Sequence, residues 1–293
     1  MRSDRPLIMG ILNANGDSFS DGGAFSTMEA QRRRLDTLIL EGADIIDIGA
    51  QTASTSISEI SIDQELERLL PILLEAIGTG VRISVDTYRS EVADAAISAG
   101  AAIVNDYSGL NDRRMADTMA RNLDRSYVLT HNIGKPKKRV TETSLYSSVA
   151  GDVLKWFRLK SIELAKRGVA ATQLIYDPGI DLSKTPRQTV EVLHGLSTLH
   201  ALGRPILLGV SRKDFIGAIT RTTPAKRLPG TLATVGFAAS ADLDLIVRVH
   251  DVGATRDFLT VLQALDTPEY VHPDLRLEPQ LYREPMEGGR PNG

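Results

Sequence analysis

The chain has 293 residues, of which 42% are hydrophobic and 24% are charged, a composition typical of a globular protein with one large core. Its formal net charge of -3 excludes the basic footprint of a nucleic-acid-binding protein, and its lack of cysteine excludes disulfides, thiolate metal sites and cysteine nucleophiles. The apolar run that follows the first five residues is too short for a signal peptide or a membrane span, so we expect a cytoplasmic location.

Short apolar runs rich in β-branched residues alternate along the chain with longer amphipathic stretches. The runs predicted as strands are 7–12, 44–48, 81–85, 101–104, 126–129, 173–176, 206–209 and 244–247. The stretches predicted as helices are 27–41, 62–77, 89–99, 112–122, 146–167, 185–201, 227–241 and 255–265. Apolar strands that alternate with helices are typical of parallel sheets covered on both sides. The pattern predicts an α/β protein with a single-domain (β/α)8 TIM barrel, and an open doubly wound sheet is the alternative.

The composition changes near the end of the chain, where five prolines fall within the last 26 residues. Proline-rich segments with little apolar content do not pack a core. We therefore expect a barrel domain over residues 1–267 and a disordered tail, without a chemical role, over residues 268–293.

Polar residues follow most of the predicted strands directly. In a barrel, these positions form one ring at the carboxyl-end face, where active sites lie. The ring consists of Asn13, Asp86, Asn105, Asp106, His131, Asp177, Ser211, Arg212, Lys213, Arg248 and His250.

Two carboxylates and one amide in this ring, Asp86, Asp177 and Asn105, suit a flat nitrogen heterocycle. A carboxylate accepts from two adjacent N–H donors, and the 2-aminopyrimidinone edge of a pterin or guanine presents such a pair. An amide both donates and accepts, so it matches a ring nitrogen and its neighbour. Asp86 and Asp177 equally fit the ordinary role of helix caps, but several such groups at strand ends favour a binding site.

Basic groups in the same ring suit a phosphorylated ligand. Lys213 lies at a helix start, where the macrodipole disfavours a cation, so its place favours an anionic or carbonyl-bearing ligand over a solvated surface charge. Arg248 and His250 share strand parity, and a guanidinium with a neighbouring imidazole suits a pyrophosphate. One amide oxygen from Asn13 suffices for Mg²⁺, which keeps several waters and uses substrate phosphates as ligands.

Several segments, in order, resemble the dihydropteroate synthase family. Together they span about residues 7–265, and their combination is far more specific than any one of them. The matching segments are 9–13, 17–23, 42–49, 84–88, 104–106, 177–179, 211–213 and 248–252.

The resemblance implies a TIM-barrel transferase of folate biosynthesis. It would join 6-hydroxymethyl-7,8-dihydropterin diphosphate to p-aminobenzoate and release pyrophosphate, with Mg²⁺ as cofactor and a homodimer as its assembly. It also implies residue roles. Asp86, Asn105, Asp177 and Lys213 would hold the pterin. Asn13 would bind the metal and, with Arg248 and His250, the diphosphate. The catalytic set would be Asp177, Lys213, Arg248 and His250.

The sequence departs from the family pattern in three loops on the p-aminobenzoate side. Ala53 and Ser54 stand where the family has a Thr-Arg pair, residues 181–182 replace Gly-Phe, and residues 14–16 are also altered. Transferable sulfonamide-insensitive synthases likewise lack the second-loop arginine, so the resemblance implies a sulfonamide-insensitive resistance enzyme. The positions expected to border p-aminobenzoate are Asp17, Ser18, Phe19, Ala53, Ser54, Leu182 and Ser211.

Two other functions are compatible with a pterin-binding barrel. One is a pterin-binding paralogue without synthase activity, although such a binder has little need of a diphosphate clamp. The other is a methyltransferase that passes a methyl group from methyltetrahydrofolate to a corrinoid. The segments 211–213 and 248–250 argue against the methyltransferase.

Overall fold

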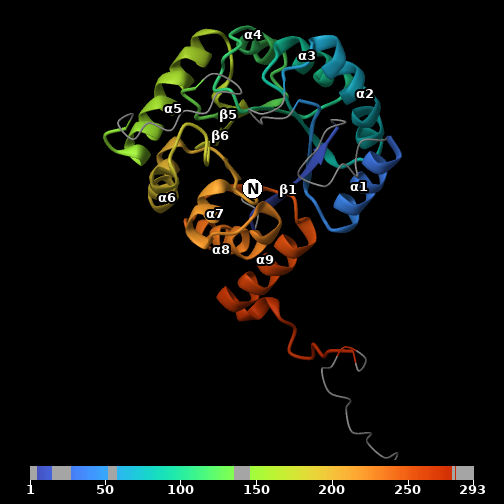
Figure 1. Ribbon diagram of the computed structural model, residues 1–293, viewed down its shortest axis with the longest axis vertical. Helices are drawn as coiled ribbons and strands as arrows, with labels where there is room; N and C mark the ends of the chain where they lie inside the picture. Colours follow the sequence, from blue (N-terminus) through green and yellow to red (C-terminus); the bar gives the residue numbers. More distant parts are fainter. Residues whose placement is uncertain (1–4, 15–27, 52–57, 135–145, 279–280, 282–293) are drawn as a thin grey trace, which may run out of the picture.

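A computed structural model of the chain describes residues 5–14, 28–51, 58–134, 146–278 and 281, and its parallel strands close into a barrel in the order β1 to β8. β1 pairs with β2 on one side and with β8 on the other, so the sheet has no edge there. The predicted TIM barrel is confirmed, and the open doubly wound sheet is wrong. Figure 1 shows the helices arranged around the strands.

The strands agree with the predicted runs to within two residues at either end. They are β1 Leu7–Asn13, β2 Ile45–Gly49, β3 Arg82–Asp86, β4 Ile103–Asp106, β5 Ser126–Thr130, β6 Leu174–Asp177, β7 Ile206–Gly209 and β8 Leu245–Val249. The strands are extended beyond the apolar runs mainly at their carboxyl ends, where the polar ring begins.

The helices follow the predicted amphipathic stretches with two differences. The stretch 185–201 divides at Gly195, where a side chain would come within 2.5 Å of the Ala150 methyl group, and a 3₁₀ segment follows over Leu196–Leu202. The helix start predicted at Lys213 is confirmed by the short helix α7, which is absent from the predicted stretches because its seven residues are too few to show a helical period. The helices are α1 Met28–Leu40, α2 Ile62–Gly78, α3 Ser90–Ala99, α4 Arg114–Arg121, α5 Val149–Lys166, α6 Pro186–His194, α7 Asp214–Thr220, α8 Leu228–Ala239 and α9 Val252–Asp266.

The core has two parts, separated by the strands. A larger cluster fills the space between strands and helices, and a smaller one fills the inside of the barrel. Successive residues of a strand face opposite sides, so every strand except β3 contributes to both clusters, and the position of β3 between its outward-facing Ile83 and Val85 is the buried Ser84. The residues inside the barrel are Met9, Ile45, Ile103, Val128, Ile175, Leu207 and Ile246.

The same alternation places the polar residues of the ring. Two residues beyond Ile45, Ile103, Ile175 and Ile246, the inward-facing positions are Asp47, Asn105, Asp177 and Arg248. Asp86 is beside Asn105 in the register of β3 and β4. The barrel is therefore apolar deep inside and charged at its carboxyl-end mouth.

Beyond α9, residues Pro268–Tyr270 form a 3₁₀ turn, and an exposed segment then leads away from the barrel (Figure 1). Most of residues 279–293 lie outside the described residues, so the domain boundary at 267 and the disorder of the tail stay predictions. Within the described part of the chain, no helix combines the length and the apolar character needed to cross a lipid bilayer.

Candidate active site at the barrel mouth

Four strands bring an acid–amide–guanidinium cluster together at the mouth. Arg248 on β8 donates from Nε to Asp47 Oδ2 on β2 at 2.6 Å and from Nη2 to Asp86 Oδ2 on β3 at 2.7 Å. Asn105 on β4 donates from Nδ2 to the same Asp47 oxygen at 3.0 Å. Three of the predicted residues, Asp86, Asn105 and Arg248, are therefore in one hydrogen-bonded group.

Asp47 also belongs to this cluster, although it does not follow a strand end and so is absent from the predicted ring. It lies inside β2 and is fully buried. A buried, inward-facing acid within an otherwise apolar strand is the signal that identifies it, because a charge is rarely buried without a partner.

Two carboxylates share one guanidinium here, which leaves the cluster one negative charge in excess when both are ionised. Burial raises the pKa of Asp86 to about 7, and the charge of Asp47 adds to the rise while Arg248 opposes it. Burial alone would lower the pKa of Arg248, but Asp47 and Asp86 together raise it above its ordinary value. The guanidinium is therefore always charged, whereas Asp86 titrates near neutral pH.

The cluster has unused hydrogen-bonding capacity. Among the described residues, the Oδ1 atoms of Asp47 and Asp86 are buried and accept no hydrogen bond. Each buried acceptor without a donor costs about 1–3 kcal/mol, so the mouth is arranged for a ligand that brings N–H donors. Arg248 occupies the Oδ2 atom of each carboxylate, so a ligand that uses both oxygens of Asp86 has to displace the guanidinium from it.

Asp177 lies at the carboxyl end of β6, across the mouth from β2. Its Oδ1 accepts from the Gly179 amide at 2.8 Å, and the side chain is almost fully buried. Burial raises the pKa of Asp177, and the Gly179 amide and then the Lys213 ammonium oppose that rise. Lys213, the residue that precedes α7, therefore acts electrostatically on Asp177, as expected of two groups that share a site.

His250 lies just past β8 and contacts Ser211 rather than Arg248. Its backbone N–H donates to Ser211 Oγ at 3.1 Å, and its Nδ1 lies 2.9 Å from the same oxygen. Burial lowers the pKa of His250 to about 3, and the positive charge of Arg248 adds to this effect. The imidazole is therefore neutral at physiological pH and offers hydrogen bonds, not a positive charge.

Several other predicted ring members have different roles. Arg212 makes a bidentate ion pair with Asp251, at 2.7 and 3.1 Å, and so is not a free cation of the ring. Asp106 is fully buried and accepts from Tyr127 at 2.7 Å, and His131 is 1% exposed. Asn13 is half-buried at the end of β1, in register with Gly49.

The expected p-aminobenzoate side is described only in part. Leu182 is half-buried in the loop after β6, and Ser211 is buried against His250. The remaining predicted positions lie outside the described residues. They are Asp17, Ser18, Phe19, Ala53 and Ser54.

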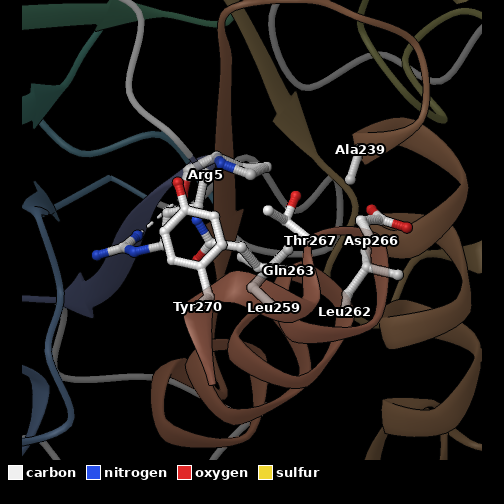
Figure 2. A pocket seen from close by; sticks show the side chains of 9 residues that line it. Arg5, Ala239, Leu259, Leu262, Gln263, Asp266, Thr267 and Tyr270 are labelled. Atoms are coloured by element: carbon white, nitrogen blue, oxygen red, sulfur yellow. Dashed lines mark hydrogen bonds between the residues drawn. The ribbon is translucent and has the colours of Figure 1, made fainter. Parts of the chain in front are cut away.

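A separate pocket lies at the opposite end of the barrel from this cluster. It is lined by Arg5, ahead of β1, and by residues of α8, α9 and the turn at Tyr270, and Figure 2 shows these side chains. Arg5 is already paired with Asp44 at 2.8 and 2.9 Å. Because the strands run from this end toward the mouth, the pocket is not connected with the predicted site.

The fold and the charged mouth define the chain as a pterin-binding barrel, and comparison with known proteins supports this class: the model of a family described as pterin binding enzyme matches residues 9–250. The dihydropteroate synthase of Neisseria meningitidis serogroup C is 38% identical over 266 residues, which cover 89% of this chain and 93% of that protein. The chain therefore belongs to the dihydropteroate synthase family, and its activity is that of a transferase.

Solved structures agree with this assignment. Xanthomonas albilineans dihydropteroate synthase with 4-aminobenzoic acid has a TM-score of 0.82 and 35% identity, over 90% of this chain and 94% of that one. The same enzyme in complex with 7,8-dihydropteroate has a TM-score of 0.79 and 35% identity, over 90% of this chain and 95% of that one.

Proposed function

We propose that the barrel mouth joins 6-hydroxymethyl-7,8-dihydropterin diphosphate to p-aminobenzoate and releases pyrophosphate. The observation that carries the proposal is the cluster of Asp47, Asp86, Asn105 and Arg248, which combines buried acceptors without donors with a permanent cation. A dihydropterin has ring N–H donors, and its diphosphate is the anion that such a guanidinium prefers. The structures of a relative with 4-aminobenzoic acid and with dihydropteroate also support it.

In this proposal, the pterin binds to the acids and the amide. Asp86 and Asp177 accept from the N–H groups of the ring, Asn105 both donates and accepts, and Lys213 donates to a ring oxygen or nitrogen. Asp177 also faces the positive charge that develops on the ring as the leaving group departs. Its position is already fixed by the Gly179 amide, so little reorganisation is needed during the reaction.

The diphosphate binds to the basic side of the mouth, through Arg248 and His250. Arg248 must first leave at least one of its carboxylates, and the pterin donors then replace it at Asp86. The neutral His250 donates a hydrogen bond from Nε2 when Nδ1 accepts from the Ser211 hydroxyl, at their distance of 2.9 Å. The pterin donors therefore replace the Arg248 hydrogen bond at Asp86, and each carboxylate keeps at least one donor.

Mg²⁺ fits the donor chemistry of the mouth as a substrate-borne ion. Within the described residues, no group of three or more His, Asp or Glu side chains could hold a metal, so this part of the chain has no metal site built from such side chains alone. The Asn13 amide oxygen, at the end of β1, is a hard ligand that would hold the ion together with the diphosphate oxygens and water. When bound, the ion neutralises charge on the departing pyrophosphate.

The reaction then needs little covalent participation from the protein. The bond between the pterin methylene carbon and the diphosphate oxygen breaks, and its electron pair leaves with pyrophosphate. The amine nitrogen of p-aminobenzoate forms a bond to that carbon and loses a proton. The protein orients the two reactants and stabilises both developing charges, with Arg248 and His250 on one side and Asp177 on the other.

A turnover assay tests the proposal. The wild-type protein is mixed with the pterin diphosphate and p-aminobenzoate, with and without Mg²⁺, and the release of pyrophosphate is followed together with the formation of dihydropteroate. We expect both products in a ratio of one to one, in a Mg²⁺-dependent reaction. Binding of the pterin diphosphate without product would instead identify a non-catalytic pterin-binding paralogue.

The affinity for the pterin should rise with pH around neutrality. Asp86 accepts from two donors only when it is ionised, and its pKa in the free protein is raised to about 7. Titration calorimetry from pH 6 to 8 should show tighter binding at the higher pH, and the Asp86→Asn variant should bind weakly with a flatter profile. Affinity that is equal at pH 6 and pH 8 in the wild type would contradict this.

The stability of the free protein should change in the opposite direction. The pKa of Asp86 is raised from an ordinary value of 3.8, so its protonated form is favoured in the fold, and this contribution is lost as the pH rises through about 7. The free protein should therefore become less stable over the interval in which it binds the pterin more tightly.

We also propose that the enzyme discriminates p-aminobenzoate from sulfonamides. The support is that the three loops that depart from the family pattern all lie on the predicted p-aminobenzoate side. One of the altered residues, Asp181, accepts with its carboxylate from the Phe215 amide at 3.1 Å and so anchors the loop after β6. The quantity to measure is the ratio of the sulfamethoxazole inhibition constant to the KM of p-aminobenzoate, in this enzyme and in a synthase with the usual loop residues. This ratio should be at least about tenfold higher here, a difference of about 1.4 kcal/mol. Equal ratios for the two enzymes would remove this part of the proposal.

A homodimer through the last helices completes the proposal. On α8, Val235 and Ala238 are buried against the barrel, whereas Phe237 is 52% exposed. A large apolar side chain so exposed suits a contact with a second copy. Light scattering should give twice the mass of the chain, and a monomer at micromolar concentration would contradict this.

A further inference from the structure

The loop after β6 folds back over a lysine of its own sequence. Lys184 is 3% exposed, and its ammonium donates to the carbonyl oxygens of Gly179 at 3.0 Å and Leu182 at 3.1 Å. Its third near contact is His131 Nδ1, at 2.9 Å, at the end of the neighbouring strand β5. The Lys184 amine therefore links both ends of the segment 179–182 to the end of the neighbouring strand β5.

These contacts use the full donor capacity of an ammonium group. An ammonium has three N–H bonds, and the two carbonyls and one imidazole nitrogen take one each, while the His131 carbonyl oxygen lies farther away, at 3.5 Å. His131 Nδ1 must then be the acceptor, which fixes the proton of this neutral ring on Nε2. Burial lowers the pKa of His131 well below its ordinary value, and the Lys184 charge adds to that effect.

The link does not depend on the charge of the lysine. Burial lowers the pKa of Lys184 to about 7, against the charges of Asp177 and Asp181, so the amine loses a proton near neutrality. A neutral amine still donates to the two carbonyls and accepts from His131, if the ring proton moves to Nδ1. The three contacts survive in either state.

The segment held in this way carries one predicted site residue and supports another. The Gly179 amide fixes Asp177, and Leu182 is the predicted p-aminobenzoate contact. The loop also lies directly on β5: a methyl group at Gly179 would come within 2.1 Å of the His131 carbonyl oxygen, at a φ of +70°. The Gly179 backbone is therefore packed closely against His131.

We propose that Lys184 is a positioning residue of the synthase reaction, which holds Leu182 at the p-aminobenzoate side and supports Asp177 through the Gly179 backbone. This inference rests on the function proposed above. Lys184 does not contact the reacting atoms itself, because its amine is enclosed by the loop and by His131. Asp177 has a second support in β6, whereas Leu182 depends on the loop alone. Loss of the link should therefore affect p-aminobenzoate more than the pterin.

The test is a comparison of Lys184→Met with Lys166→Met, a surface control at the exposed end of α5. Two quantities are measured: the Kd of the pterin diphosphate without p-aminobenzoate, and the KM of p-aminobenzoate in turnover. For Lys184→Met we expect the KM to rise about tenfold or more while the Kd changes less than about threefold, since a misplaced contact residue costs up to about 100-fold. Lys166→Met should match the wild type.

A pair of His131 variants tests the same link if Lys184→Met does not fold. His131→Asn keeps an acceptor near the position of Nδ1, and His131→Phe removes it while keeping an aromatic ring beside Trp156, whose ring centre lies 5.0 Å away. We expect the Phe variant alone to raise the KM of p-aminobenzoate. Equal behaviour of the two variants, or equal changes in KM and Kd, would overturn the proposal. A wild-type protein without turnover would refute the proposed function instead.

Discussion

Replacing Arg248 by methionine should lower kcat/KM for the pterin diphosphate by about 100- to 1000-fold, which corresponds to roughly 2.7–4 kcal/mol of transition-state stabilisation. The guanidinium is the one permanent cation that the described part of the chain places directly on the acid cluster, and its removal takes away the charge opposite the departing pyrophosphate. Binding of the pterin without its diphosphate should change much less, because Asp86 loses a competitor while its pKa rises without the opposing Arg248 charge. Steady-state kinetics and titration calorimetry with the two ligands measure this difference.

The same substitution should destabilise the free protein. It leaves Asp47 and Asp86 buried without a counter-ion, a loss that typically costs about 3–5 kcal/mol. Denaturant unfolding measures it, with Arg121→Met, an exposed ion pair on α4, as a control that should change stability by less than about 1 kcal/mol. The double variant Arg248→Met with Asp47→Asn should regain stability but not activity. If activity also returns, Arg248 serves only to neutralise the acids.

Replacing Asp177 by asparagine should lower kcat/KM by about 100- to 1000-fold without a cost in stability. The variant loses the carboxylate that accepts from the pterin and faces its developing positive charge. Asparagine keeps an oxygen for the Gly179 amide, which lies 2.8 Å from Asp177 Oδ1. Because burial raises the pKa of Asp177, the ionised form is disfavoured in the fold, and a neutral replacement should be as stable as the wild type or more stable at pH 8.

Kinetics and thermal unfolding at pH 8 check both parts of this prediction. The Asp181→Asn variant is the matched control, since Asp181 is the neighbouring acid of the same loop and contacts Thr189 and Phe215 instead of the mouth. It should lose stability more than activity. An Asp177→Asn protein with wild-type kcat/KM would show that Asp177 does not contact the pterin.

The sequence predicted the barrel and much of the mouth, because both depend on local patterns. Strand parity alone places Asp86, Asn105, Asp177 and Arg248 on the inside, and the register of β3 and β4 brings the first two side by side. The end of each apolar run shows where the mouth begins. These properties belong to single segments and to their order, so one sequence was sufficient.

The pairings within the mouth could not be predicted, because they depend on which strands become neighbours across the barrel. The joint role of Arg248 and His250 at a diphosphate stays a prediction. The sequence did not indicate that Arg248 contacts Asp47 and Asp86 while His250 contacts Ser211. No local pattern marks a guanidinium on β8 as the partner of acids on β2 and β3.

Two buried groups were missed for related physical reasons. Asp47 lies within its strand and has no predicted site role, although it is the residue that leaves the cluster with an excess negative charge. Lys184 follows a glycine- and aspartate-containing loop and looks like a surface residue. Only the fold shows that the loop closes over its amine.

The central claim is that the acids of the mouth bind the heterocycle while the basic groups bind its phosphates. A crystal structure with the dihydropterin diphosphate tests it most directly. The ring should lie against Asp86, Asn105 and Asp177, with Arg248 turned from Asp86 toward the phosphates. A ligand bound at the far end of the barrel near Tyr270, or a ring at the mouth with Arg248 still on both carboxylates, would contradict it.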